Sequence, residues 1–198
     1  MARYEHDVFI SYSHLDDLSV TDEPGWVSQF RKALVAELSR RLGRDVEQTI
    51  WRDDRSNGGQ HAIDRAVQEA IENTAVMLAL CSAAYLSSVY CTNERQRFVA
   101  TANAGPGLYV GDRSRLLPLW LMKWPREKLP HELASVSGYA FYSTQGSYST
   151  QGSDRPLAPS SPLFAERVQE VAVGVADVLE ILDQREPPTN VDPVAAPT

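Results

Sequence analysis

A continuous apolar run, AVMLALC at residues 75–81, limits the fold of this chain more than any other feature. A short run without a polar residue is typical of a strand in the middle of a parallel sheet, where helices cover both faces. Other strand-like segments are residues 7–13, 45–51, 115–122 and 139–142. Pro118 has no N–H group, so we expect the 115–122 strand to be incompletely paired on one side.

Segments with helical periodicity alternate with these strands. An apolar residue recurs every four positions in residues 26–42, from Trp26 to Leu42, and Gly43 is a typical helix stop. Further helices are predicted over residues 61–73, from a cap at Ser87 or Ser88 to about Ala102, and over 161–182. This alternation predicts an α/β fold, with a parallel sheet between two layers of helices.

Composition excludes several classes of protein. The net charge of −7 argues against a broad nucleic-acid surface, although Arg40, Arg41 and Arg44 could form a local basic groove, as could Arg95 and Arg97. No apolar run approaches the ~20 residues that a membrane span needs, and the N-terminus leaves no room for a secretory signal. Cys81 and Cys91 are interpreted as reduced thiols in a cytoplasmic protein.

In open α/β sheets the ligand lies beyond the carboxyl ends of the strands, where SYSHLDD, RDDRSNGGQ, CSAAYLSSVY and MKWPREKLP are expected. The order of carboxylates and Lys123 along the strands argues against an aspartate phosphoacceptor site. The SNGGQ loop lacks the lysine of a phosphate-binding loop, and the histidines have no metal-ligand spacing, so no metal is expected. A serine hydrolase is disfavoured because no G-x-S-x-G sequence is present.

Tyr90 and Glu94 are one helical turn apart, close to this edge of the sheet. Phe98 continues the same face, so Glu94 could be partly desolvated, which would raise its pKa. An aromatic ring beside a carboxylate can stack on a heteroaromatic base while the acid stabilises a cationic sugar carbon. Spacing alone favours a plainer interpretation, a solvent-facing glutamate beside a packing tyrosine.

Several segments, in order, resemble Toll/interleukin-1 receptor (TIR) domains. DVFISYSHLDD is similar to the first signature of the family, and residues 51–94 are similar to its second strand, BB loop, second helix and third strand. The resemblance extends over residues 4–142 and implies a flavodoxin-like sheet of order 2-1-3-4-5. The predicted domain is 1–184, with a polar repeat-containing loop at 143–160, a final helix at about 162–183 and a proline-rich tail at 185–198.

The resemblance to NAD-cleaving bacterial TIR domains also implies roles for residues. Glu94 is expected at the catalytic position, and Asp54 is expected at the pocket border. The other expected substrate-binding residues are Tyr90, Phe9, Ser11, Tyr12, Ser13 and Arg55. The BB loop, expected to act in assembly, contains Ser56, Asn57, Gly58, Gly59 and Gln60.

Two positions depart from the family pattern. Tyr90 replaces the usual tryptophan, which leaves a smaller stacking surface. His14 and Leu15 stand where some NAD-cleaving members have arginines, so His14, Arg52 and Arg55 are the candidates for diphosphate contacts.

The resemblance implies an NAD+ glycohydrolase that releases nicotinamide and ADP-ribose, or a cyclic form of it. NAD+ would be its substrate, with no separate cofactor and with neither nucleic acid nor membrane as a direct partner. Activity would need self-association, in bacterial antiphage defence, and the tail could join a sensor domain. A non-catalytic TIR adaptor is the alternative. A nucleoside deoxyribosyltransferase is a weaker one, since it leaves the BB-loop segment unexplained.

Overall fold

The computed structural model describes residues 4–19, 22–52, 65–143 and 155–184. Within this part of the chain, five parallel strands form a sheet of order β2-β1-β3-β6-β7. These strands are β1 (His6–Ser11), β2 (Ile50–Arg52), β3 (Thr74–Cys81), β6 (Leu116–Trp120) and β7 (Tyr139–Ala140). Counted within this sheet alone, the order is 2-1-3-4-5, which confirms the predicted flavodoxin-like fold.

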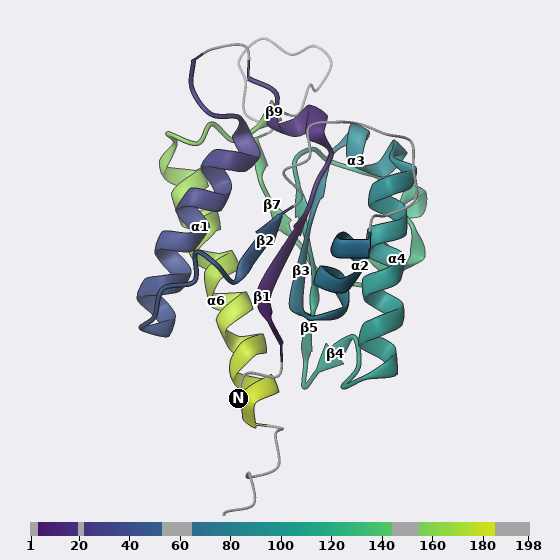
Figure 1. Ribbon diagram of the computed structural model, residues 1–198. Helices are drawn as coiled ribbons and strands as arrows, with labels where there is room; N and C mark the ends of the chain where they lie inside the picture. Colours follow the sequence, from purple (N-terminus) through teal and green to yellow (C-terminus); the bar gives the residue numbers. More distant parts are fainter. Residues whose placement is uncertain (1–3, 20–21, 53–64, 144–154, 185–198) are drawn as a thin grey trace, which may run out of the picture.

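Two layers of helices cover the sheet (Figure 1). Helices α1 (Trp26–Leu42) and α6 (Pro162–Gln184) pack against each other on one face, and α2 (Arg65–Glu72) and α4 (Val89–Ala104) lie on the other. The shorter helices are η1 (His14–Asp17), α3 (Ala83–Ser87), η2 (Arg126–Lys128) and α5 (His131–Ala134), and β4 (Tyr109–Val110) pairs with β5 (Arg113–Ser114). Among the described helices, none is long and apolar enough to cross a membrane.

Strand β3 explains why residues 75–81 contain no polar side chain. Alternate residues point to opposite faces of a strand. Val76, Leu78 and Leu80 enter the core under α1 and α6, whereas Met77 and Ala79 enter the core under α2 and α4. Every residue of β3 is buried, so the predicted central strand is confirmed.

Helix α1 also forms where its periodicity predicts. Phe30, Leu34 and Leu38 are fully buried, and the helix ends at Gly43, whose φ of +66° is left-handed. Phe30 stacks on Trp26 at a centroid distance of 5.6 Å, and Phe141 and Phe164 meet this pair edge-on.

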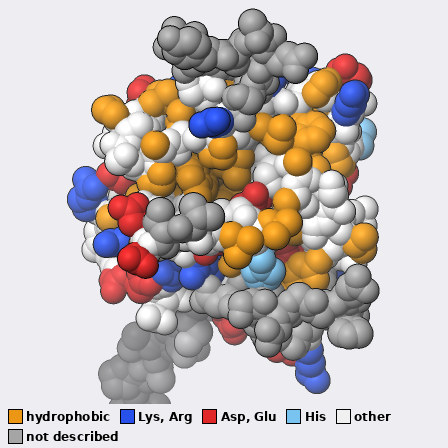
Figure 2. Space-filling view, turned by 90° about the horizontal axis from the view of Figure 1, so that it is seen from above, with side chains coloured by type: hydrophobic (Ala, Val, Ile, Leu, Met, Phe, Trp, Pro, Cys, Tyr) orange, Lys and Arg blue, Asp and Glu red, His pale blue; other side chains and the backbone are white. Residues whose placement is uncertain are grey.

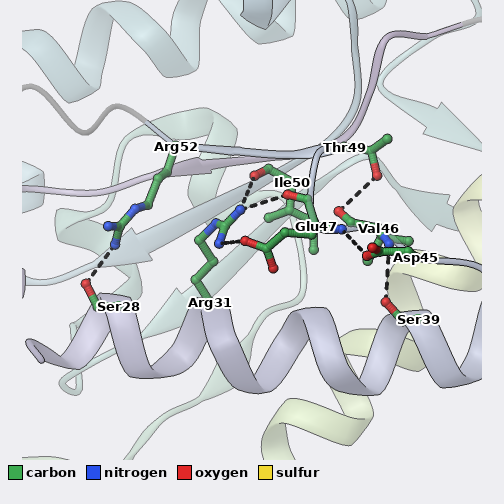
Figure 3. A network of polar contacts seen from close by, with 9 residues as sticks. All are labelled: Ser28, Arg31, Ser39, Asp45, Val46, Glu47, Thr49, Ile50 and Arg52. Carbon is green, nitrogen blue, oxygen red and sulfur yellow. Dashed lines mark hydrogen bonds and ion pairs between the residues drawn. The ribbon is translucent and has the colours of Figure 1, made fainter.

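The predicted strand at 45–51 was too long at its start, because β2 begins at Ile50 and residues 47–49 form a turn. The Thr49 and Ile50 N–H groups both donate to the Val46 carbonyl, at 3.0 and 3.1 Å, which closes this turn. Figure 3 shows polar contacts that join α1 to this segment. The Arg31 guanidinium pairs with the Glu47 carboxylate at 2.5 Å, and donates to the backbone oxygens of Glu47 and Ile50 at 2.8 and 3.3 Å. Arg31 thus holds both the turn and the start of β2 against α1.

The carboxyl-terminal half differs from the predictions in detail. Strand β6 pairs with β7 only through Leu119 and Trp120, consistent with the incomplete pairing expected from Pro118. Strand β7 is shorter than the predicted 139–142 strand, because β8 (Tyr142–Ser143) leaves the sheet and pairs with β9 (Arg155–Pro156). The predicted loop at 143–160 therefore contains a short strand, while its residues 144–154 lie outside the described residues. The final helix, predicted at about 162–183, is α6. The predicted tail at 185–198 lies outside the described residues.

Candidate functional site at the carboxyl edge of the sheet

The carboxyl ends of β1 and β3 lie side by side at one edge of the sheet, because Ser11 pairs with Ala79 in the parallel ladder. Figure 2 looks onto this edge, and hydrophobic side chains gather across much of it. Three exposed apolar residues belong to elements that start here. Leu15 and Leu18 lie in and after η1, and Val89 opens α4; they are 65%, 70% and 75% exposed.

Helix α4 presents Glu94 to the end of β1. Ser88 caps the helix as predicted, since its hydroxyl accepts a hydrogen bond from the Cys91 N–H at 3.2 Å. The second turn of α4 then carries Glu94, which is only 2% exposed. The Ser11 hydroxyl donates to Glu94 Oε2 at 2.5 Å, so a residue at the end of β1 holds the carboxylate.

The aromatic residue predicted to accompany Glu94 lies one turn earlier on α4. Tyr90 is half-buried, whereas Phe98, one turn after Glu94, is 1% exposed. The face that runs through these three residues thus passes from the rim of the sheet edge into the core. Glu94 is therefore not the solvent-facing glutamate that spacing alone favours.

The predicted residues of β1 and its following turn occupy different environments. Tyr12 is near the site, since its carbonyl accepts a 3.4 Å hydrogen bond from Cys91 Sγ and its ring meets His14 edge-on at 5.4 Å. Ser13 is half-buried, and its carbonyl accepts from the Asp16 N–H. Phe9 instead lies in the core below, fully buried and stacked on Trp51 at 4.7 Å.

The remaining site residues named from the sequence lie outside the described residues. They are Asp54, Arg55 and the BB-loop residues Ser56, Asn57, Gly58, Gly59 and Gln60. Of the candidates for diphosphate contacts, His14 lies on η1 at the site edge. Arg52 donates to the Ser28 hydroxyl at 2.8 Å and pairs with Asp17 at 3.4 Å (Figure 3 shows the first contact), so it already stabilises the start of α1.

Two adjacent aspartates on η1 have different partners, which the sequence did not reveal. Asp17 accepts from the N–H and the hydroxyl of Ser28 at 2.8 and 2.7 Å, so it caps α1 from outside the helix. Asp16 turns the other way and accepts from the Ser82 hydroxyl at 2.7 Å. Burial raises the pKa of Asp16, although the bond from Ser82 opposes the shift. A second carboxylate therefore lies at this edge of the sheet.

Two buried residues behind Glu94 were also missed. Tyr85, on α3, is fully buried with its hydroxyl 3.3 Å from Ser11 Oγ. Arg95 is 1% exposed, and its Nε donates to Glu132 Oε1 at 2.9 Å. The sequence did hold a signal for Arg95, which falls on the helical face of α4 that includes Cys91 and Phe98.

This placement corrects the expected basic groove, because Arg95 is buried and cannot share a surface with Arg97. Arg97 is exposed and contacts Glu72. In the other expected cluster, Arg40 contacts Glu37, Arg44 contacts Asp7 and Arg41 is exposed.

Cys81 and Cys91 are free thiols, and their buried surroundings keep both protonated. Burial, with the nearby charge of Glu94, raises the pKa of Cys91 to about 12. Burial also raises the pKa of Cys81. Neither thiol is therefore an activated nucleophile at neutral pH. In the described ranges, no group of three or more histidine, cysteine, aspartate or glutamate side chains could hold a metal ion.

The sequence was compared with known protein families and with curated proteins. The family model described as TIR domain matches residues 8–154, which include most of β1, the other strands of the sheet and the residues at its carboxyl edge. No curated protein matches the chain. Because the matched region covers well over half of the sequence, and the sheet has the expected order, the chain belongs to the TIR domain family.

Proposed function

We propose that this TIR domain is an NAD+ glycohydrolase in which the Glu94 carboxylate is the catalytic group. The observation that carries the proposal is the placement of Glu94 itself, a carboxylate 2% exposed at the ligand-binding edge of the sheet. Its partner Ser11 holds Oε2 at 2.5 Å. A residue that served only adaptor contacts would have no need of this burial.

The energetic argument is that a buried carboxylate costs several kcal/mol of desolvation unless partners offset it. A hydrophobic residue of similar size at position 94 would pack beside Phe98 without that cost. Retention of a charge at such a place is typical of functional sites, where a fixed anion in a low-dielectric setting acts strongly on a developing cation. The plainer alternative of a structural charge does not explain why it lies at this edge.

The reaction that fits is cleavage of the nicotinamide–ribose bond. The C1′–N bond breaks, its electron pair goes to the pyridine nitrogen, and neutral nicotinamide leaves. Glu94 stabilises the positive charge that develops on the ribose carbon. A water oxygen then bonds to C1′ and releases a proton, which gives ADP-ribose; an internal nucleophile of the ADP-ribose would give a cyclic product instead.

The other predicted residues have supporting roles in this proposal. Tyr90 stacks on a base of the substrate, with a smaller ring than tryptophan and hence slower turnover. Ser11 and Tyr12 shape the site beside α4, and Phe9 supports them from the core. Asp54, Arg55 and residues 56–60 would close the pocket, and self-association of TIR domains would bring in a neighbouring BB loop. Antiphage defence in the cytoplasm is the setting we propose.

The test is nicotinamide release from NAD+ by concentrated or artificially clustered protein. Glu94→Gln keeps the side-chain shape and removes the charge, so we expect at least a hundredfold loss of rate, the scale of a lost transition-state charge contact. Glu166→Gln, on the exposed surface of α6, is the matched control and should retain full activity. Equal activity of the Glu94 variant and wild type would refute the assignment.

One observation favours the adaptor alternative, namely the apolar residues Leu15, Leu18 and Val89 exposed at the same edge. Such residues are suited to contacts with another domain. If clustered wild-type protein leaves NAD+ intact while Leu18→Asp abolishes self-association, the adaptor function replaces the enzymatic one.

A further inference from the structure

A line of polar side chains, all buried except Glu132 at its outer end, leads from α5 to Glu94. Glu132 on α5 binds Arg95 Nε at 2.9 Å, and the Arg95 guanidinium lies 5.8 Å from the centre of the Tyr85 ring. The Tyr85 hydroxyl is 3.3 Å from Ser11 Oγ, which in turn donates to Glu94 at 2.5 Å. The four residues Ser11, Tyr85, Arg95 and Glu132, here called the polar chain, come from four different elements.

The charges along the polar chain are unequal. Arg95 is almost fully buried, its Nη1 has no hydrogen-bond partner among the described residues, and Glu132 is 20% exposed at its side chain. Burial alone would lower the pKa of Arg95, but the Tyr85 hydroxyl and Glu132 raise it overall, so Arg95 is a cation. Because solvent weakens the effect of the Glu132 charge on Arg95, the positive charge of Arg95 is not fully neutralised and acts on the site in front of it.

Tyr85 connects this field to the site. Burial raises the pKa of Tyr85, so its hydroxyl keeps its proton. Ser11 has one proton, which the short contact with Glu94 Oε2 takes, so in the 3.3 Å contact the Tyr85 hydroxyl is the donor and Ser11 Oγ the acceptor. The Ser11 proton is then directed at Glu94. Hydrogen bonds arranged in this way polarise one another, which strengthens the last one.

We infer that the polar chain positions Glu94 and holds it as the anion in which it acts on the substrate. Tyr85, Arg95 and Glu132 are thus positioning residues, which act on Glu94 through Ser11 or through their charge. The inference rests on the proposed function for its meaning, but the state of Glu94 can be measured without any catalysis.

Other ionisable groups surround Glu94 and enter the design of the test. Cys91 on α4 interacts directly with the charge of Glu94, and Asp16 on η1 interacts with Cys91. Cys81 on β3 interacts with Arg95 and Cys91, and Tyr85, Arg95 and Glu132 are linked to Glu94 through the polar chain. Cys81, Cys91 and Tyr85 stay protonated in the acid range because burial raises the pKa of each. Asp16 and Glu132 are the other carboxyl groups of this set, and both titrate in the acid range. Glu132 is replaced in one of the variants, and every variant is also made in an Asp16→Asn background.

The direct test is a carbon-13 NMR titration of the glutamate carboxyl groups, in which the Glu94 resonance is assigned as the one lost in Glu94→Gln. Arg95→Gln removes the positive charge and should move the Glu94 midpoint up by roughly one pH unit. Glu132→Gln removes the negative charge that partly neutralises Arg95, so the Glu94 midpoint should move down. Opposite shifts from the two variants would not follow from a merely structural role. Midpoints unchanged within 0.2 pH units, or moved in the same direction, would overturn the inference.

Kinetics supply a second measurement in clustered protein. Tyr85→Phe removes a single hydroxyl and should lower kcat about fivefold to tenfold with little change in KM, as expected for one lost hydrogen bond. Tyr139→Phe, a half-buried tyrosine packed against α6, is the matched control. Arg95→Gln should shift the acid limb of the pH–rate profile. Arg95→Lys keeps the positive charge, so its acid limb should lie close to that of wild type.

The two failures are distinguishable. If wild type does not release nicotinamide, the proposed function fails, while the titration still decides whether the polar chain controls Glu94. If wild type is active but the titration and the acid limb are unmoved by Arg95→Gln and Glu132→Gln, the proposed function stands and the inference is wrong.

Discussion

Replacement of Ser11 by alanine tests the contact on which the site depends. Ser11→Ala removes the donor that lies 2.5 Å from Glu94 Oε2 and leaves a carboxylate that is 2% exposed without it. A hydrogen bond to a charged group contributes about 1.5–3 kcal/mol, and the loss of one partner of a buried charge reaches the upper part of that range. We therefore expect the free energy of unfolding to fall by about 2–3 kcal/mol at pH 7.

A double-mutant cycle separates this contact from a general packing defect. Glu94→Leu removes the acceptor and leaves no charge to satisfy, so in that background Ser11→Ala should cost less than about 0.5 kcal/mol. The assay is urea denaturation of all four proteins, followed by circular dichroism. Ser87→Ala, an exposed serine on α3, is the control for the substitution itself. A coupling free energy within 0.5 kcal/mol of zero would refute the reasoning, because Ser11 would then not stabilise Glu94.

Three further predictions concern the scaffold. In Gly174→Ala the new Cβ would lie 2.2 Å from the Tyr139 hydroxyl, so the variant should lose about 1–3 kcal/mol in urea denaturation, and adding Tyr139→Phe should restore most of it. Asp17→Ala removes the cap on Ser28 and should cost about 1–2 kcal/mol, whereas Asp17→Asn should cost less; equal losses would exclude capping as the cause. The pKa of Cys91 is raised from 9.0 to about 12 in the folded protein. The protonated thiol therefore contributes to the free energy of unfolding below pH 9, and this contribution is lost between pH 9 and 12. Across that window Cys91→Ala should flatten the decline in unfolding free energy by up to ~1.4 kcal/mol per pH unit, and an unchanged slope would contradict this.

The sequence was sufficient for those parts of the fold where a local pattern matches the burial. The uninterrupted apolar run of β3 and the four-residue spacing in α1 each reflect a face packed in the core, so both were located correctly. The start of β2 could not be predicted, because residues 47–49 close a turn on the Val46 carbonyl and Arg31 of α1 binds this turn from 16 residues away. Such long-range side-chain contacts leave no trace in local periodicity.

The candidate site likewise has some features that local sequence signals predict and others that only long-range contacts produce. The position of Glu94 at the carboxyl edge follows from strand order and the cap at Ser88, both of which are local signals. The hydroxyl of Ser11 was named from the sequence, but its contact with Glu94 spans 83 residues and needed the structure. Tyr85 and Arg95 were missed because a tyrosine after a strand and an arginine in a charged segment look like surface residues. The packing of α3, α4 and α5 buries both residues, and for Arg95 the helical face that it shares with Cys91 and Phe98 was the one signal in the sequence.

The central claim is that Glu94 catalyses cleavage of NAD+, and nicotinamide release measures it most directly. Wild-type protein, clustered at high concentration, should release nicotinamide, while Glu94→Gln, folded to the same extent by circular dichroism, should release at least about a hundredfold less. Release by the Glu94→Gln variant at the wild-type rate, or intact NAD+ with clustered wild type, would contradict the account.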